Sequence, residues 1–115
     1  MQYNQLDNTI ISSLEDIKAQ DITLIQIDSM SSVADAMIVC NGNSDRHVKS
    51  IANSLITDLK GKGYKIFGHE GLEDGEWVLV DAGDAIVHIM KPEAREYYQL
   101  ENLWHTAPQE AINAQ

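Results

Sequence analysis

The most constraining feature of the sequence is a pair of β-rich runs, 76–81 and 85–90, joined by a short turn that contains Gly83. Apolar β-formers on both sides of a glycine-containing turn predict a β-hairpin. Side chains alternate between the two faces of a strand, so each strand presents a mostly apolar set and a mixed set. The mixed set comprises Trp77, Leu79 and Asp81 on the first strand and Ile86, His88 and Met90 on the second.

Within the mixed set, Trp77 is the residue that most strongly suggests binding. A face that carries Asp81 and His88 is not expected to form the deepest core. A tryptophan beside polar groups suits an interface anchor with a polar rim. The alternative is that Trp77 is half-buried and only covers the edge of the sheet, and the sequence leaves both interpretations open.

The rest of the chain alternates helical and β-rich segments. Apolar spacing, capping residues and Pro92 predict helices over about 5–19, 48–59 and 92–104, and β-rich runs predict further strands over 22–27, 36–40 and 64–67. The central helix carries an apolar stripe at helical spacing: Val48, Ile51, Ala52, Leu55, Ile56 and Leu59. Ser44 or Asp45 is placed to cap the central helix, and Gly61 or Gly63 to end it. The order α-β-β-α-β-β-β-α predicts an α/β fold, a single-domain mixed sheet layered with helices. The polar tail 106–115 is expected to be disordered.

The net charge of the chain limits the kinds of partner that it is expected to bind. With 115 residues the chain is the length of one domain, and 18 acidic against 8 basic side chains give a formal charge of −10. This charge repels phosphate backbones and anionic membranes, so broad nucleic-acid binding is not expected, whereas encounter with a basic protein is favoured. No apolar run approaches the ~20 residues of a membrane span, and residues 1–4 lack a signal-peptide pattern. A cytoplasmic protein is therefore expected.

Residues that could carry catalysis are sparse. The single Cys40 ends an apolar run and is expected to pack as a small hydrophobe, and the four histidines lack the paired spacing of a zinc site. Gly42 and Ser44 resemble a phosphate-binding turn, which makes a nucleotide-binding or nucleotidyl-transferring enzyme the alternative function. The carboxylate pair that would hold magnesium is missing, however, so a protein without catalytic activity, metal or cofactor is predicted.

Arg46 and His47 open the central helix and allow two interpretations. They could contact an anion or a partner at the helix N-terminus, where amide groups are unpaired. They could instead orient the preceding loop through hydrogen bonds to Asp35 or to backbone carbonyls, which is the interpretation that we favour.

Several short motifs, in this order and with these separations, closely resemble the ribosomal silencing factor family, also called the Iojap-related proteins. The matching segments are 20–22, 31–35, 42–48, 70–71, 77–81, 83–84, 87–88 and 95–104. The sequence departs from the family pattern at Asn41 and Asn43, where members often carry small hydroxyl residues. The resemblance implies a nucleotidyltransferase-like mixed sheet in a family domain over 1–105.

The resemblance also implies a function. Such proteins dock on large-subunit ribosomal protein fourteen, block association of the ribosomal subunits and so repress translation when nutrients are scarce. A homodimer is implied as well, and a placeholder role in ribosome assembly on the same surface is the third possibility. Combined with the mixed face of the hairpin, this implies a partner-binding site made of Glu70, Trp77, Leu79, Asp81, His88, Met90 and Tyr98.

Overall fold

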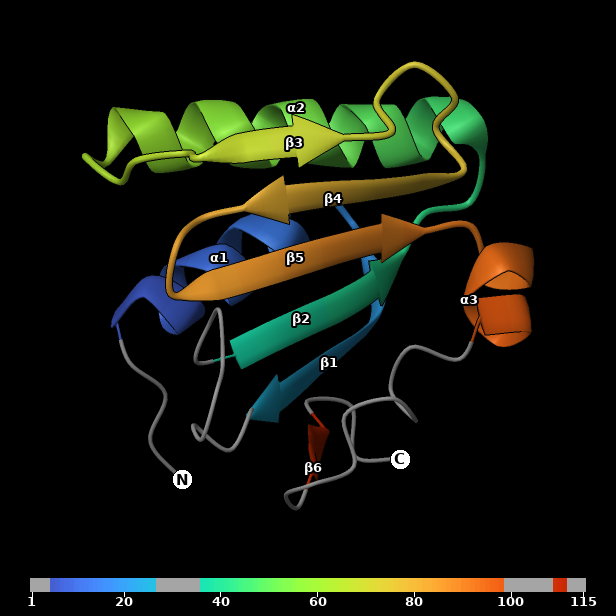
Figure 1. Ribbon diagram of the computed structural model, residues 1–115, viewed down its shortest axis with the longest axis horizontal. Helices are drawn as coiled ribbons and strands as arrows, with labels where there is room; N and C mark the ends of the chain where they lie inside the picture. Colours follow the sequence, from blue (N-terminus) through green and yellow to red (C-terminus); the bar gives the residue numbers. More distant parts are fainter. Residues whose placement is uncertain (1–4, 27–35, 99–108, 112–115) are drawn as a thin grey trace.

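The structure, a computed structural model, describes residues 5–26, 36–98 and 109–111 (Figure 1). Its helices are α1 (Gln5–Asp16), α2 (Asp45–Gly61) and α3 (Pro92–Tyr98), and its strands are β1 (Gln20–Gln26), β2 (Ala36–Asn41), β3 (Gly68–Glu70), β4 (Trp77–Asp81), β5 (Ala85–Met90) and β6 (Gln109–Ala111). In the described part of the chain the strands form one sheet in the order β3-β4-β5-β2-β1-β6. The predicted single-domain mixed α/β fold is thereby confirmed.

The sheet is mixed because β2 and β5 run parallel, whereas the other neighbours are antiparallel. A parallel pair needs a long connection. Here α2 and the β3–β4 segment provide it, and they place β5 at the centre of the sheet beside β2 (Figure 1). The predicted hairpin is present, and Ala82 N–H donates to the carbonyl of Ala85 at 2.9 Å across its turn.

One face of the sheet carries the main core, under α1 and α2. Most of the predicted apolar stripe of α2 is buried there: Val48, Ile51 and Leu55 are fully buried, whereas Ile56 is partly buried. From the hairpin, Val78, Val80, Val87 and Ile89 point to the same side and are also fully buried. Burial of such apolar side chains is the main favourable term in folding. We call this the helix face.

The opposite face holds a smaller cluster and is called the second face below. Its buried members are Ile25, Met37, Val39, Met90 and Ala94, and Trp77 packs against them. Ala94 belongs to α3, so this helix packs on the second face next to Met90, the last residue of β5. The two sides of the sheet therefore differ in what covers them.

The limits of several helices and strands differ from those predicted from the sequence. The third strand is Gly68–Glu70 and not 64–67, because its partner β4 ends at Asp81, opposite Gly68, and leaves the earlier residues without a strand to pair with. The first helix ends at Asp16, since Lys18 adopts a φ of 66° just beyond it. Within the tail expected to be disordered, β6 pairs antiparallel with β1. Residues 99–104 of the predicted last helix lie outside the described residues.

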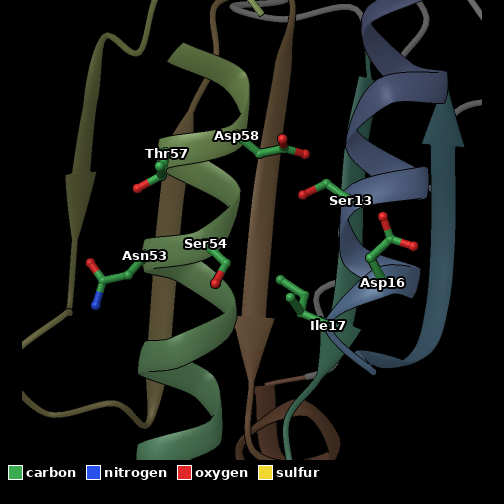
Figure 2. Close-up of a pocket in the computed structure, with 7 residues that line it drawn as sticks. All are labelled: Ser13, Asp16, Ile17, Asn53, Ser54, Thr57 and Asp58. Atoms are coloured by element: carbon green, nitrogen blue, oxygen red, sulfur yellow. The ribbon is translucent and has the colours of Figure 1, made fainter. Parts of the chain in front are cut away.

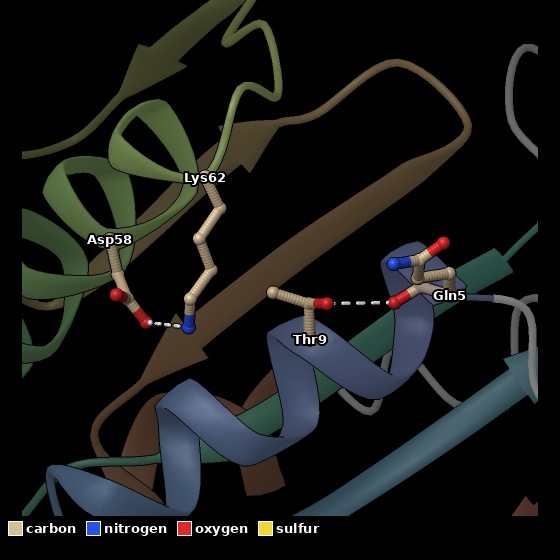
Figure 3. Close-up of polar contacts among 4 residues, drawn as sticks. All are labelled: Gln5, Thr9, Asp58 and Lys62. Carbon is tan, nitrogen blue, oxygen red and sulfur yellow. Dashed lines mark hydrogen bonds and ion pairs between the residues drawn. The ribbon is translucent and has the colours of Figure 1, made fainter.

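The surfaces of α1 and α2 show ordinary helical contacts. Thr9 Oγ1 donates to the carbonyl of Gln5 at 2.8 Å, and Lys62 Nζ lies 3.4 Å from Asp58 Oδ2 (Figure 3). Exposed pairs of this kind contribute about 0.5 kcal/mol or less. In the described ranges, no helix combines the length and apolar character that crossing a membrane requires.

Candidate docking surface on the second face

Strand register gathers most of the sequence-predicted site residues on the second face. Leu79 of β4 stands opposite Glu70 of β3 on one side and His88 of β5 on the other, so the three form a row across the sheet. Trp77 pairs with Met90 in the adjacent row, nearer α3. Directly opposed residues of an antiparallel pair share a face. Asp81 occupies the row beyond Leu79, opposite Ile86.

Exposure divides this group in two. Glu70 is exposed, and Trp77, Leu79 and Asp81 are half-buried, so these four offer surface to a partner. His88 is only 8% exposed and Met90 is fully buried, so both lie beneath that surface and support it. The side chain of Tyr98, the last residue of α3, lies outside the described residues.

A hydrogen bond joins the exposed and the buried parts of the site. The indole N–H of Trp77 donates to Nδ1 of His88 at 3.0 Å. The centroids of the two rings lie 5.9 Å apart, and the ring planes are inclined at 47°. Burial lowers the pKa of His88 from 6.5 to about 4. The imidazole is therefore neutral at pH 7, and because Nδ1 accepts, its proton sits on Nε2.

Asp81 has a structural task as well as an exposed edge. Its Oδ1 accepts the backbone N–H of Gly83 at 2.9 Å, which closes the hairpin turn, and Gly83 adopts a φ of +90° that favours glycine. Within the candidate site, Glu70 is thus the exposed acid, and Asp81 is a half-buried acid held in place by the turn.

Gly71 is a site residue that sequence reasoning did not assign a role. Its φ is +87°, and a Cβ there would overlap the carbonyl oxygen of Trp77. Only glycine lets the chain pass this close to the start of β4, so Gly71 sets the position from which Trp77 projects. The signal was present in the Glu70-Gly71 motif, but its meaning depends on a contact that sequence alone does not show.

Arg95 of α3 is a second residue to which the sequence alone assigned no role. Its Nη1 donates to the carbonyl of Asp21 at 2.6 Å and to Asn41 Oδ1 at 3.1 Å, while Nη2 donates to Thr23 Oγ1 at 3.0 Å. Asn41 Nδ2 in turn donates to Asp21 Oδ2 at 3.3 Å. These charge-assisted bonds fasten α3 to the ends of β1 and β2 and so frame one end of the second face. They also give the unusual Asn41 a structural role.

The loop that prompted the enzyme alternative has a structural explanation. Ser44 is the N-cap of α2 and accepts the backbone N–H of His47 at 3.1 Å. His47 Nδ1 accepts from the N–H of Asn43 at 2.8 Å, and its Nε2 lies 3.3 Å from the carbonyl of Ile17. A Cβ at Gly42 would meet Val48 at 2.8 Å. These contacts support the loop-orienting interpretation of His47, whereas Asp35 lies outside the described residues.

Two other features bear on chemistry. Cys40 is fully buried, and burial raises the pKa of its thiol to about 12, so it is protonated and packs as a small hydrophobe. A polar groove lies between α1 and α2, remote from the second face, and is lined by Ser13, Asp16, Ile17, Asn53, Ser54, Thr57 and Asp58 (Figure 2). Among the residues that the structure describes, no group of three or more His, Cys, Asp or Glu side chains is arranged to hold a metal ion.

Several known proteins are similar in sequence to this chain. A relative named ribosomal silencing factor, from Chromobacterium violaceum, is 47% identical over 104 residues, covering 90% of this chain and 85% of the relative. A relative from Haemophilus influenzae, also named ribosomal silencing factor, is 45% identical over 95 residues, covering 83% of this chain and 93% of the relative. A mouse protein named for mitochondrial assembly of the ribosomal large subunit is 33% identical over 98 residues, covering 83% of this chain and 43% of its own length.

Solved structures agree. A crystal structure of a Chromobacterium violaceum protein, 44% identical in sequence, superposes with a TM-score of 0.86 and covers 97% of this chain and 93% of its own. The family model described as ribosomal silencing factor during starvation matches residues 1–115. The resemblance drawn from the sequence motifs is thereby confirmed, and the chain belongs to the ribosomal silencing factor family.

Proposed function

We propose that this protein represses translation by binding the large ribosomal subunit through large-subunit ribosomal protein fourteen and blocking its association with the small subunit when nutrients are scarce. One observation carries the proposal: half-buried Trp77 and Leu79 share the second face with exposed Glu70, which stands opposite Leu79. Interfaces take most of their binding energy from a few such apolar anchors surrounded by a polar rim.

Charge supports a basic partner. The formal charge of −10 favours encounter with a positively charged ribosomal protein, because complementary potentials raise association rates. Glu70 provides negative charge at the rim of the surface, and Asp81 provides it at the hairpin turn. The name of the mouse relative, which refers to the ribosomal large subunit, supports that subunit as the target.

The proposed mechanism is steric and involves no chemical step. A protein bound at the face where the small subunit joins occupies the space that the subunit would take. The regulatory names of the relatives support a role without catalysis, as does the use of Ser44 as a helix cap. Turnover of nucleoside triphosphates in the presence of magnesium, abolished by Ser44→Ala in a variant that remains folded, would contradict this part of the proposal.

Co-sedimentation tests the central claim. The protein is expected to sediment with isolated large subunits but not with small subunits or intact ribosomes, because joining covers the docking surface. Binding to purified large-subunit protein fourteen then tests the direct contact, with the ribosomal protein of another large-subunit surface as the control. Equal binding to both subunits would overturn the proposal.

The proposal includes a cytoplasmic homodimer, as the family resemblance implies. Sedimentation equilibrium of the free protein tests the dimer, and a concentration-independent monomer mass would remove it. A placeholder role in assembly of the large subunit is the second candidate, and the name of the mouse relative favours it. Enrichment on immature large subunits, with no effect on the joining of mature subunits, would distinguish this role from silencing.

A further inference from the structure

We propose that His88 is a positioning residue, which holds the indole of Trp77 in the orientation that docks on the partner. The inference rests on the proposed function and assigns His88 a different task from the direct contact expected from the sequence. Its starting point is the 3.0 Å hydrogen bond from Trp77 Nε1 to His88 Nδ1.

His88 is itself held firmly. It lies on β5 between Leu79 of β4 and Val39 of β2, so strand pairing fixes its backbone on both sides. Only 8% of the residue is exposed, and Val39 on the parallel strand is fully buried. A side chain enclosed in this way has few rotamers available. The acceptor atom of the hydrogen bond is therefore at a fixed place.

Trp77, by contrast, is the half-buried first residue of β4. Its ring packs against the apolar cluster of the second face, but such apolar contact does not fix the orientation of the ring. The hydrogen bond adds direction, because only one orientation of the indole points its N–H at Nδ1. A side chain that is ordered before binding loses less entropy when it binds. His88 thus improves docking without touching the partner.

The same bond indicates how the partner meets Trp77. The indole N–H, the one polar group of the side chain, is already engaged within the chain. The matching surface of the partner then consists of aliphatic groups or of a cation over the ring rather than of a hydrogen-bond acceptor. This assigns the partner pocket a chemical character that agrees with a basic ribosomal protein.

The first test uses the unmodified protein. In ¹⁵N spectra of the imidazoles at pH 7, His88 is expected as the tautomer protonated at Nε2, with a hydrogen-bonded indole resonance for Trp77. Trp104→Phe assigns that resonance, because the chain holds only two tryptophans. A proton found on Nδ1 would overturn the proposal, since Nδ1 could then not accept.

The second test compares two variants of similar size. His88→Leu removes the acceptor and is expected to weaken binding to isolated large subunits about fivefold to tenfold, in line with the loss of one typical hydrogen bond. In His88→Asn the side-chain oxygen branches from the same carbon as Nδ1 and is expected to restore binding to within about twofold. Wild-type binding by a folded His88→Leu would contradict the proposal.

A double-mutant cycle separates positioning from direct contact. If His88 acts only through Trp77, His88→Leu has no further effect on binding in a Trp77→Phe background, because phenylalanine has no N–H to hold. An equal loss in both backgrounds would show direct contact and overturn the inference. Absence of any binding by the wild type would instead refute the proposed function, while the spectra would still report whether His88 orients Trp77.

Discussion

The two faces of the same hairpin differ in what they do. On the helix face, Val78, Val80, Val87 and Ile89 are fully buried under α1 and α2. On the second face, Trp77, Leu79 and Ile86 are only half-buried, and the indole N–H of Trp77 donates a hydrogen bond to buried His88. Alternate residues of two strands thus stabilise the fold on one side and remain available for recognition on the other.

Two isoleucines of β5 give the largest expected contrast in stability. Ile89 is fully buried on the helix face, whereas Ile86 is half-buried on the second face. Ile89→Ala is expected to lower the free energy of unfolding by about 3 kcal/mol, because it leaves a cavity in a packed core. Ile86→Ala is expected to cost about 1 kcal/mol. Urea denaturation measures both, and equal losses would remove the distinction between the faces.

Lowering the pH is expected to lower the free energy of unfolding, because His88 is buried on the second face. The folded chain keeps His88 neutral down to about pH 4, while the unfolded chain takes up the proton near pH 6.5. The unfolded state therefore binds more protons in this window, and stability falls as the pH drops from 6.5 to 4. The loss attributable to His88 is on the order of 3 kcal/mol, at 1.36 kcal/mol per pKa unit.

Subtracting the unfolding free energies of His88→Asn from those of the wild type at each pH isolates this contribution. His69→Asn is the matched control, because His69 is an exposed histidine on β3. A wild-type curve with the same slope as that of His88→Asn between pH 4 and 6.5 would show that burial of His88 has no such cost.

Trp77→Ala tests recognition directly. It is expected to weaken binding to large-subunit protein fourteen by about 2 kcal/mol, roughly thirtyfold, as for other tryptophan anchors. Because Trp77 also packs on the second-face cluster, a loss of stability near 1 kcal/mol should accompany it. Tyr64→Ala, at a partly buried aromatic residue on the helix face, should lower stability without changing affinity. The opposite pattern would place Trp77 in the core and leave the docking surface elsewhere.

The smallest expected effect concerns charge. Glu70→Gln combined with Asp81→Asn should slow association severalfold at low salt and flatten its salt dependence, while dissociation changes less. Asparagine keeps the oxygen that accepts the Gly83 N–H, so the turn should survive. Glu15→Gln with Asp16→Asn removes the same charge from exposed positions of α1 and should have a weaker effect. Identical rates for the two double variants would show that only net charge matters.

The local pattern of the sequence was sufficient for the hairpin, the apolar stripe of α2 and its cap at Ser44, because each depends on residues close together in the chain. It also placed Trp77, Leu79, Asp81, His88 and Met90 on one side of the hairpin, since alternation in a strand is fixed by geometry. Whether these residues bind the partner is still a prediction. The third strand was misplaced because its limits are set by the end of β4 rather than by its own residues.

Only the tertiary structure decided what lies next to these elements. It buried Met90 and His88 beneath Trp77, put Gly71 against the start of β4, and joined Arg95 to Asp21 across 74 positions of sequence. The sequence by itself determined the family, the alternation of the hairpin and the acidic character, because motifs, period and charge are properties of the chain. Burial, tautomer and strand neighbours are properties of contacts between distant segments, and those exist only once the sheet has assembled.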